Sequence, residues 1–267
     1  MFGKLLKYDF RSMCKQFAFI WPAALALAVV NRFTINGLDS TSSVGETTAG
    51  IAMLVYVAIL MAMFIVALIF VIQRFYKGLL GDEGYLMHTL PVHSWQLIGS
   101  KLLCAVVTTV VSVLVALLSI LLIVPWSRSD LQEFFSGLGY LFSHWGVETT
   151  HLIIACIEMF LFVLVCFATG YLQLYLSMGV GHLFNRNRVA MSVVAFIAIN
   201  VVFNVLRSLV NPLLDNVLQP LSHNMTFPES MSSFHALIWI LIALQLVLCA
   251  IYFAGTEFIL RKKLNLE

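Results

Sequence analysis

Six long apolar runs constrain the fold of this 267-residue chain more than any other feature. They cover approximately residues 17–35, 49–73, 99–124, 151–178, 189–210 and 235–257. An α-helix rises about 1.5 Å per residue, so about 20 residues cross the roughly 30 Å hydrocarbon core of a bilayer, and every run has about that length. Backbone polar groups inside lipid are satisfied only in helices or closed barrels. These runs are continuous rather than alternating, which favours helices.

The composition agrees with this interpretation. Hydrophobic residues make up 61% of the chain and charged residues only 10%, whereas soluble domains average about 45–50% and about 25%. We therefore expect an all-α polytopic membrane protein with a single transmembrane domain over residues 1–267. The net charge of +2 argues against nucleic acid as a partner, because a nucleic-acid binder needs a clustered basic face. The lipid bilayer is the expected environment.

Lysine and arginine predict the orientation, since cytoplasmic segments are enriched in both. Of the 15 in the chain, 12 lie in the N-terminal segment, the second and fourth breaks between runs, and the C-terminal tail. The other three, Arg32, Arg128 and Arg207, are spread over the alternate breaks. Both termini are therefore expected in the cytoplasm.

Residues 2–16 predict an amphipathic helix that precedes the first span. The apolar residues that can share one face are Phe2, Leu5, Leu6, Met13 and Phe17, while Lys4, Lys7, Arg11 and Lys15 lie mostly off that face. Such a helix can lie at the inner interface, with its basic side chains near anionic headgroups. The alternative is a plain cytoplasmic extension of the first span. The first run lacks a small-x-small cleavage site, so we expect it to be retained rather than removed as a signal peptide.

The outer segments differ from one another. Residues 125–150 are rich in aromatic residues and predict a re-entrant or interfacial helix on the outer face. Residues 211–234 contain Pro212, Pro220 and Pro228, which are expected to break helices there.

The segment from Arg74 to Lys101 is an inner break of its own kind. Its first residues continue the helical pattern of the second run, and Gly-Asp-Glu-Gly at 81–84 interrupts that pattern. A short apolar patch follows, made of Tyr85, Leu86, Met87 and Leu90. Pro91 ends this turn, and Ser94 can cap the helix of the next span. The break therefore predicts a helix end, a tight turn, one short surface helix and a kink. An apolar patch that faces the cytoplasm indicates a docking partner.

The sequence FYKGLLGDEGYLMHTLPVHSWQLIGSKLL in this break resembles the first cytoplasmic loop of ATP-binding-cassette (ABC) transporter permeases of the type-2 exporter class. The shared elements are Glu83-Gly84, Leu86, Leu90-Pro91 and Lys101. That family also has six spans, cytoplasmic termini and an amphipathic N-terminal elbow helix, which residues 2–16 resemble. Within it, the chain is most similar to small bacterial permeases that work with a separate ATPase.

The resemblance implies the site and the partners. Residues 74–98 would be the coupling loop, with a short cytoplasmic coupling helix between the second and third spans that sits in a cleft of the ATPase. The implied coupling residues are Asp82, Glu83, Gly84, Tyr85, Leu86, Met87, Leu90 and Pro91. The inner break from Gly179 to Arg188 would make a minor contact. The chain carries no GxxxxGK[ST] phosphate loop, so ATP and Mg²⁺ are expected in a dimer of a partner ATPase, alongside a second copy of the permease or a related one. The cargo would be an amphipathic peptide, an antibiotic or a lipid-like molecule.

Glu158 is the one acidic residue deep inside an apolar run, and such a carboxylate normally faces protein or water. It lines the transport pathway or a permease–permease interface, or else it bonds a neighbouring helix through Gln173, Asn200, Asn204 or Gln245. His144, Glu148 and His151 share its helical face at spacings of 4, 3 and 7. This face predicts either a metal or proton site, or solvated side chains at the start of the span.

Other classes of function remain open. An intramembrane enzyme would need paired catalytic groups at matching depth, for which His151 and Glu158 are the candidates. A membrane sensor or immunity protein that does not transport would bind a partner without an ATPase. All five cysteines lie in or beside apolar runs without a CxxC pair, which favours packed thiols over disulfides or metal ligands. We expect no catalytic residue, metal site or cofactor in this chain.

Overall fold

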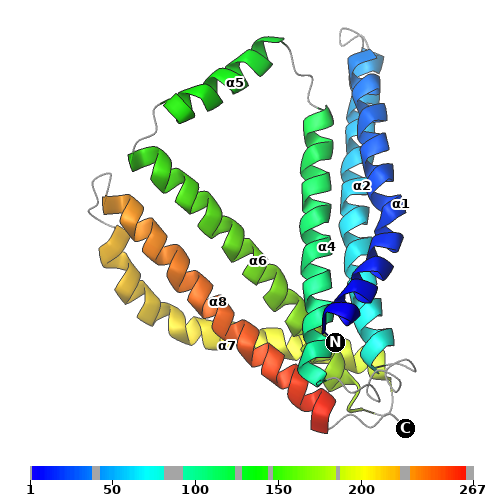
Figure 1. Cartoon of the computed structure of the whole chain (residues 1–267), viewed down its shortest axis with the longest axis vertical. Helices are drawn as coiled ribbons and strands as arrows, with labels where there is room; N and C mark the ends of the chain where they lie inside the picture. The colour runs from blue at the N-terminus through cyan, green and yellow to red at the C-terminus, as the bar shows by residue number, and fades with distance from the viewer. Residues whose placement is uncertain are drawn as a thin grey trace. The chain divides into compact units, whose positions relative to one another are not determined.

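The computed structural model describes residues 2–37, 43–80, 93–123, 128–143, 147–184, 187–222 and 229–262 (Figure 1). Within these ranges the chain is almost entirely helical and contains no strand. The elements are α1 (Phe2–Gly37), α2 (Ser43–Phe75), the π-helical turn η1 (Tyr76–Leu80), α4 (Ser94–Ile123), α5 (Arg128–Ser143), α6 (Val147–Gly181), α7 (Arg188–Ser222) and α8 (Glu229–Lys262).

Six of the described helices are long and apolar enough to cross a membrane, which confirms the all-α class for the described residues and the six predicted helices of span length. The apolar segments are Gly3–Phe33, Gly50–Leu80, Ser94–Ile123, Thr149–Gly181, Arg188–Ser208 and Phe234–Arg261. The chain therefore has the helices expected of a multi-pass membrane protein. The sidedness of the termini is not tested by the fold and stays a prediction.

The helices extend further than the apolar runs. α1 is continuous from Phe2 to Gly37, so no break separates the predicted elbow from the first span. Of the predicted apolar face, Met13 and Phe17 are buried and Leu5 and Leu6 are half-buried, while the four basic side chains are exposed. Whether this part lies at the membrane interface stays a prediction.

The expectation that prolines end the helix after residue 210 is wrong for two of the three. α7 continues through Pro212 and Pro220 to Ser222. A proline removes one N–H donor and crowds one carbonyl, and a long helix keeps the hydrogen bonds on either side. Pro228 lies outside the described residues. α5 confirms a helix within residues 125–150, and its re-entrant or interfacial position stays a prediction.

The chain groups into two compact units. The first comprises residues 1–74 and 103–143, and the second comprises residues 75–102 and 144–267. The grouping concerns how helices pack, and the single permease domain over residues 1–267 stays a prediction.

The first unit packs α1, α2 and α4 through small residues. Ala24, Met63 and Ala116 form its buried cluster. Polar contacts also cross between these helices. Trp21 Nε1 donates to Ser112 Oγ at 3.1 Å, and the hydroxyls of Tyr56 and Ser119 lie 2.7 Å apart. Small residues with hydrogen bonds between helices are what holds helices together in lipid, where apolar burial gives no driving force.

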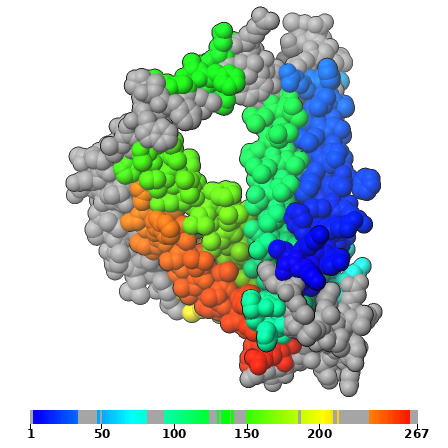
Figure 2. Space-filling view, viewed as in Figure 1, coloured from blue at the N-terminus to red at the C-terminus, as the bar shows by residue number. Residues whose placement is uncertain are grey.

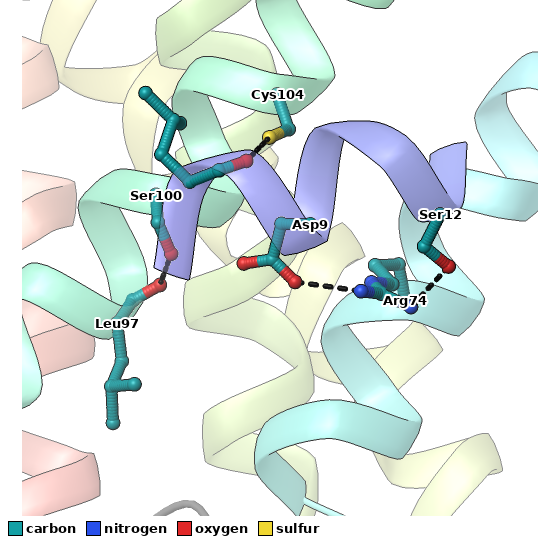
Figure 3. A network of polar contacts seen from close by, with 7 residues as sticks. Asp9, Ser12, Arg74, Leu97, Ser100 and Cys104 are labelled. Atoms are coloured by element: carbon teal, nitrogen blue, oxygen red, sulfur yellow. Dashed lines mark hydrogen bonds and ion pairs between the residues drawn. The ribbon is translucent and has the colours of Figure 1, made fainter. Parts of the chain in front are cut away.

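An ion pair joins the start of α1 to the end of α2 (Figure 3). Arg74 Nη2 lies 2.7 Å from Asp9 Oδ1, and Arg74 Nη1 donates to Ser12 Oγ at 2.9 Å. Asp9 is only 2% exposed, so its carboxylate depends on this partner. Cys104 Sγ of α4 also lies 3.9 Å from the Leu6 carbonyl. The first turns of α1 are therefore fixed to the unit rather than a free arm.

The second unit is built on α6, which packs along α8 (Figures 1 and 2) and also contacts α7. Thr169 Oγ1 of α6 donates to the Gln245 carbonyl of α8 at 3.4 Å. Gly255 of α8 lets the Leu176 side chain approach closely, since a Cβ there would lie 3.0 Å from its Cδ1. η1 and the first turns of α4 belong to this same unit.

Candidate functional site

Glu158 has two partners, and both come from α8. His235 Nδ1 lies 2.6 Å from Glu158 Oε2, and Trp239 Nε1 donates to Glu158 Oε1 at 2.8 Å. His235 and Trp239 are four residues apart, so they present side chains on one face of α8. Glu158 is 6% exposed. Both carboxylate oxygens are therefore satisfied inside the apolar part of the molecule.

His151 extends this cluster by one side chain. Its Nδ1 lies 3.2 Å from His235 Nε2, and the two rings have centroids 5.3 Å apart. His151 precedes Glu158 by seven residues, two helical turns on the same face of α6. The contacts form a line, Glu158–His235–His151, in which His235 uses both ring nitrogens. We call these three residues with Trp239 the carboxylate–histidine cluster.

The local sequence explains why the cluster forms. A carboxylate in lipid costs several kcal/mol unless it is paired, and apolar helices offer few partners. α8 supplies an imidazole and an indole N–H one turn apart, and this spacing matches the two oxygens of one carboxylate. The cluster thereby also fixes the register between α6 and α8.

The alternative that Glu158 bonds a neighbouring helix is confirmed, but its partners are not the predicted ones. The predicted partners Gln173, Asn200, Asn204 and Gln245 do not bond its carboxylate among the described contacts. Asn200 Nδ2 instead donates to the Phe196 carbonyl of its own helix at 2.8 Å. His144 lies outside the described residues, as does the side chain of Glu148. Whether Glu158 also lines a pathway stays a prediction.

Sequence reasoning missed both His235 and Trp239 as partners of Glu158. His235 is the first residue of the sixth predicted span. Their four-residue spacing inside an apolar run was the available signal. A polar pair on one helix face predicts a polar partner on the neighbouring helix.

The linear arrangement does not suit a metal ion. A metal needs donors that converge on one point, whereas both ring nitrogens of His235 are directed at separate partners. Among the described residues no group of three or more His, Cys, Asp or Glu side chains is placed to hold an ion.

The predicted coupling residues, 82–91, lie outside the described residues, but both ends of the loop are defined. Phe75, at the end of α2, stacks on Tyr175 of α6 with centroids 3.9 Å apart and planes 6° from parallel. Leu79 and Leu80 of η1 are buried, as are Leu97 and Ile98 of α4. The two chain segments that enter and leave the loop are thus packed into the second unit.

Lys101, in the second turn of α4, is buried beside η1. It is 4% exposed, and a Cβ added at Gly78 would lie 2.6 Å from its Nζ. The absence of a side chain at Gly78 therefore leaves room for the ammonium group. π-Helical turns such as η1 often mark functional sites.

The turn between α6 and α7 also lies near η1, because its residue His182 contacts Tyr76. A Cβ on Gly181 would overlap Ser192 Oγ and lie 2.6 Å from the backbone N and Cα of that residue, so the two helices meet there without space for a methyl group. Asn187 has φ 57°, a left-handed conformation that asparagine tolerates, and its carbonyl accepts the Met191 N–H at 3.0 Å.

His182, just after α6, contacts the loop entrance. Its ring lies edge-on to Tyr76 of η1 with centroids 5.0 Å apart. Burial lowers the pKa of His182, a bond to the Met178 carbonyl opposes that effect, and Arg188 adds to the lowering. His182 is therefore favoured as the neutral imidazole in this contact. The break from Gly179 to Arg188 thus touches the segment that enters the loop.

No protein-family model, curated protein or solved structure matches this chain. The functional interpretation consequently depends on the residues themselves.

Proposed function

We propose that this protein is the membrane-spanning subunit of an ATP-driven exporter of the ABC type-2 class. It forms the pathway for an amphipathic peptide, an antibiotic or a lipid-like molecule in the bacterial cytoplasmic membrane. It works with a second copy or a related permease and with a dimer of a separate ATPase, which binds ATP and Mg²⁺.

The observation that supports this proposal best is the packing of both ends of the coupling loop into one unit. The chain enters the loop through Phe75 and the last three residues of η1 and leaves it through Leu97 and Ile98. These residues are buried and belong to the unit of residues 75–102 and 144–267. A displacement of the loop would be transmitted to α6, α7 and α8 through close contacts such as the Phe75–Tyr175 stack. Packed interiors transmit displacement because they have low compressibility.

The mechanism that follows is a two-state change of the permease. The ATPase dimer closes when it binds nucleotide, and the loop carries this motion into the second unit. The nucleotide shifts the equilibrium only to the extent that it binds one state more tightly than the other. The carboxylate–histidine cluster holds α6 to α8, so these helices would move together.

A charge reversal in the loop tests the proposal. Glu83→Lys is expected to abolish co-purification of the ATPase and transport-linked ATP hydrolysis, because it replaces the acidic residue of the implied docking turn. Glu133→Lys on α5 is the matched control, since it makes the same charge change at an exposed position outside the loop.

The two variants give a clear decision. The proposal requires the Glu83 variant to fail while the Glu133 variant behaves as the wild type. Normal ATPase binding and hydrolysis in both would contradict the coupling role. Co-purification of a partner that is not an ATPase would instead favour the non-transporting sensor or immunity protein.

A further inference from the structure

The carboxylate–histidine cluster has a geometry that accommodates two protonation states. In the state with one proton fewer, both histidines are neutral: His235 donates from Nδ1 to Glu158 and accepts at Nε2 from the Nδ1–H of His151. With one proton more, His235 donates from both nitrogens, and His151 accepts at Nδ1 and carries its proton on Nε2. Trp239 donates to Glu158 in both states. Every hydrogen bond is retained without movement of a heavy atom.

We infer that Glu158, His235 and His151 form a proton-binding site within the membrane-spanning part of the protein. The proton enters on His151 Nε2, and the Nδ1–H bond of His151 breaks as its proton passes to His235 Nε2. The net reaction adds one H⁺ and changes no oxidation state. The site then holds the pair of the Glu158 carboxylate and the His235 imidazolium.

The charge balance explains what the proton does. Without it, the cluster carries one net negative charge in an apolar setting, which is costly. With it, the site is neutral overall and the Glu158–His235 contact becomes a charge-assisted hydrogen bond, consistent with its length of 2.6 Å. Proton uptake therefore strengthens the contact between α6 and α8.

The other described charged and imidazole side chains of these helices do not bond to the cluster, so the proton exchange involves the cluster alone. The other charged or imidazole side chains described on α6, α7 and α8 of this unit, and on the turn after α6, are Arg188, Arg207, Glu257, Arg261 and His182. Arg207 is exposed, and the rest lie at the opposite end of these helices from His151, more than 20 residues along α6 or α8 or at the start of α7. Among the described contacts, none of these side chains bonds to the cluster.

The position of His151 provides the route of access. It lies two residues inside the apolar segment Thr149–Gly181 and is half-buried, whereas Glu158 is about 10 Å deeper along α6. By the predicted orientation, the proton exchanges with the extracytoplasmic side. The proton site does not require an ATPase partner, so it stands or fails independently of the proposed function.

Nitrogen NMR of the full chain in lipid nanodiscs, with the seven histidines ring-labelled with ¹⁵N, tests the inference directly. The method separates the imidazolium from the two neutral tautomers. As the pH is lowered, His235 should become an imidazolium and His151 should change from the Nδ1–H to the Nε2–H tautomer in the same transition. A His151 tautomer that does not change when His235 gains its proton would overturn the proposal, as would a His235 that remains neutral down to the pH at which the protein unfolds.

Variants assign the signals and supply a second readout. His151→Gln and His235→Gln each remove the two ring-nitrogen signals of one histidine. His93→Gln changes an exposed histidine just before α4 and should leave the coupled transition unchanged. In Glu158→Gln, at a pH where the wild type is loaded, the His235 imidazolium signal should be lost. Retention of that signal in Glu158→Gln would show that the carboxylate is not part of the site.

Discussion

The contact between Glu158 and His235 allows a quantitative prediction through a double-mutant cycle with leucine. His235→Leu leaves the Glu158 carboxylate, 6% exposed, with Trp239 as its partner among the described contacts. Breaking a buried ion pair from one side costs about 3–5 kcal/mol. A neutral hydrogen bond between membrane helices contributes only about 0.6 kcal/mol on average, with a maximum of about 1.7. The size of the loss in unfolding free energy when the contact is broken therefore separates a charge-paired contact from a neutral hydrogen bond.

The double variant completes the argument. Replacement of both partners by apolar residues is often neutral or stabilising, because no charge is left unpaired. We therefore expect the free energy of unfolding of Glu158→Leu/His235→Leu to lie within about 1–3 kcal/mol of the wild-type value. The remaining loss comes from the indole N–H of Trp239, which no longer has the Glu158 carboxylate as its acceptor. Reversible unfolding in mixed detergent–SDS micelles, followed by circular dichroism, measures all four members of the cycle. A coupling free energy at or below about 1.7 kcal/mol, within the range of neutral hydrogen bonds, would refute the charge-paired interpretation.

Two glycines give further predictions. Gly181→Ala forces a methyl group onto the backbone of Ser192, so we expect it to lower stability by about 1–3 kcal/mol, seen as a lower thermal midpoint. Gly170→Ala, with no atom within 4 Å of the added Cβ, should be neutral or slightly stabilising, and an equal loss in both variants would contradict the steric argument. Gly78→Ala meets only the end of the Lys101 side chain, so stability should change little while ATP hydrolysis linked to transport falls; loss of stability with normal hydrolysis would be the contrary result.

The six spans could be predicted from sequence because their signal is a property of each segment alone. Length and hydropathy are local, and a bilayer sets the required length. The residues at which the helices end were harder to predict from sequence. α7 continues through Pro212 and Pro220, since a missing N–H weakens a helix without always ending it.

The pairing of helices could not be predicted in the same way. When every face of a helix is apolar, hydropathy does not show which face meets another helix. Polar residues are the exception, and Glu158 did indicate an interface. Its partner His235 lies in the second turn of α8, and neither spacing nor hydropathy shows that this residue faces Glu158 on α6. The contact of Gly78 with Lys101 depends on three-dimensional placement and has no counterpart in the spacing of the residues.

The central claim is that the loop between α2 and α4 receives a force from an ATPase on the cytoplasmic side. The most direct measurement is photo-crosslinking in cells from a photoreactive residue introduced at position 86, followed by identification of the adduct. The account predicts an adduct with a P-loop ATPase whose yield changes when nucleotide is trapped on that enzyme. An adduct formed only with extracytoplasmic proteins, or no ATPase adduct at any nucleotide state, would contradict it.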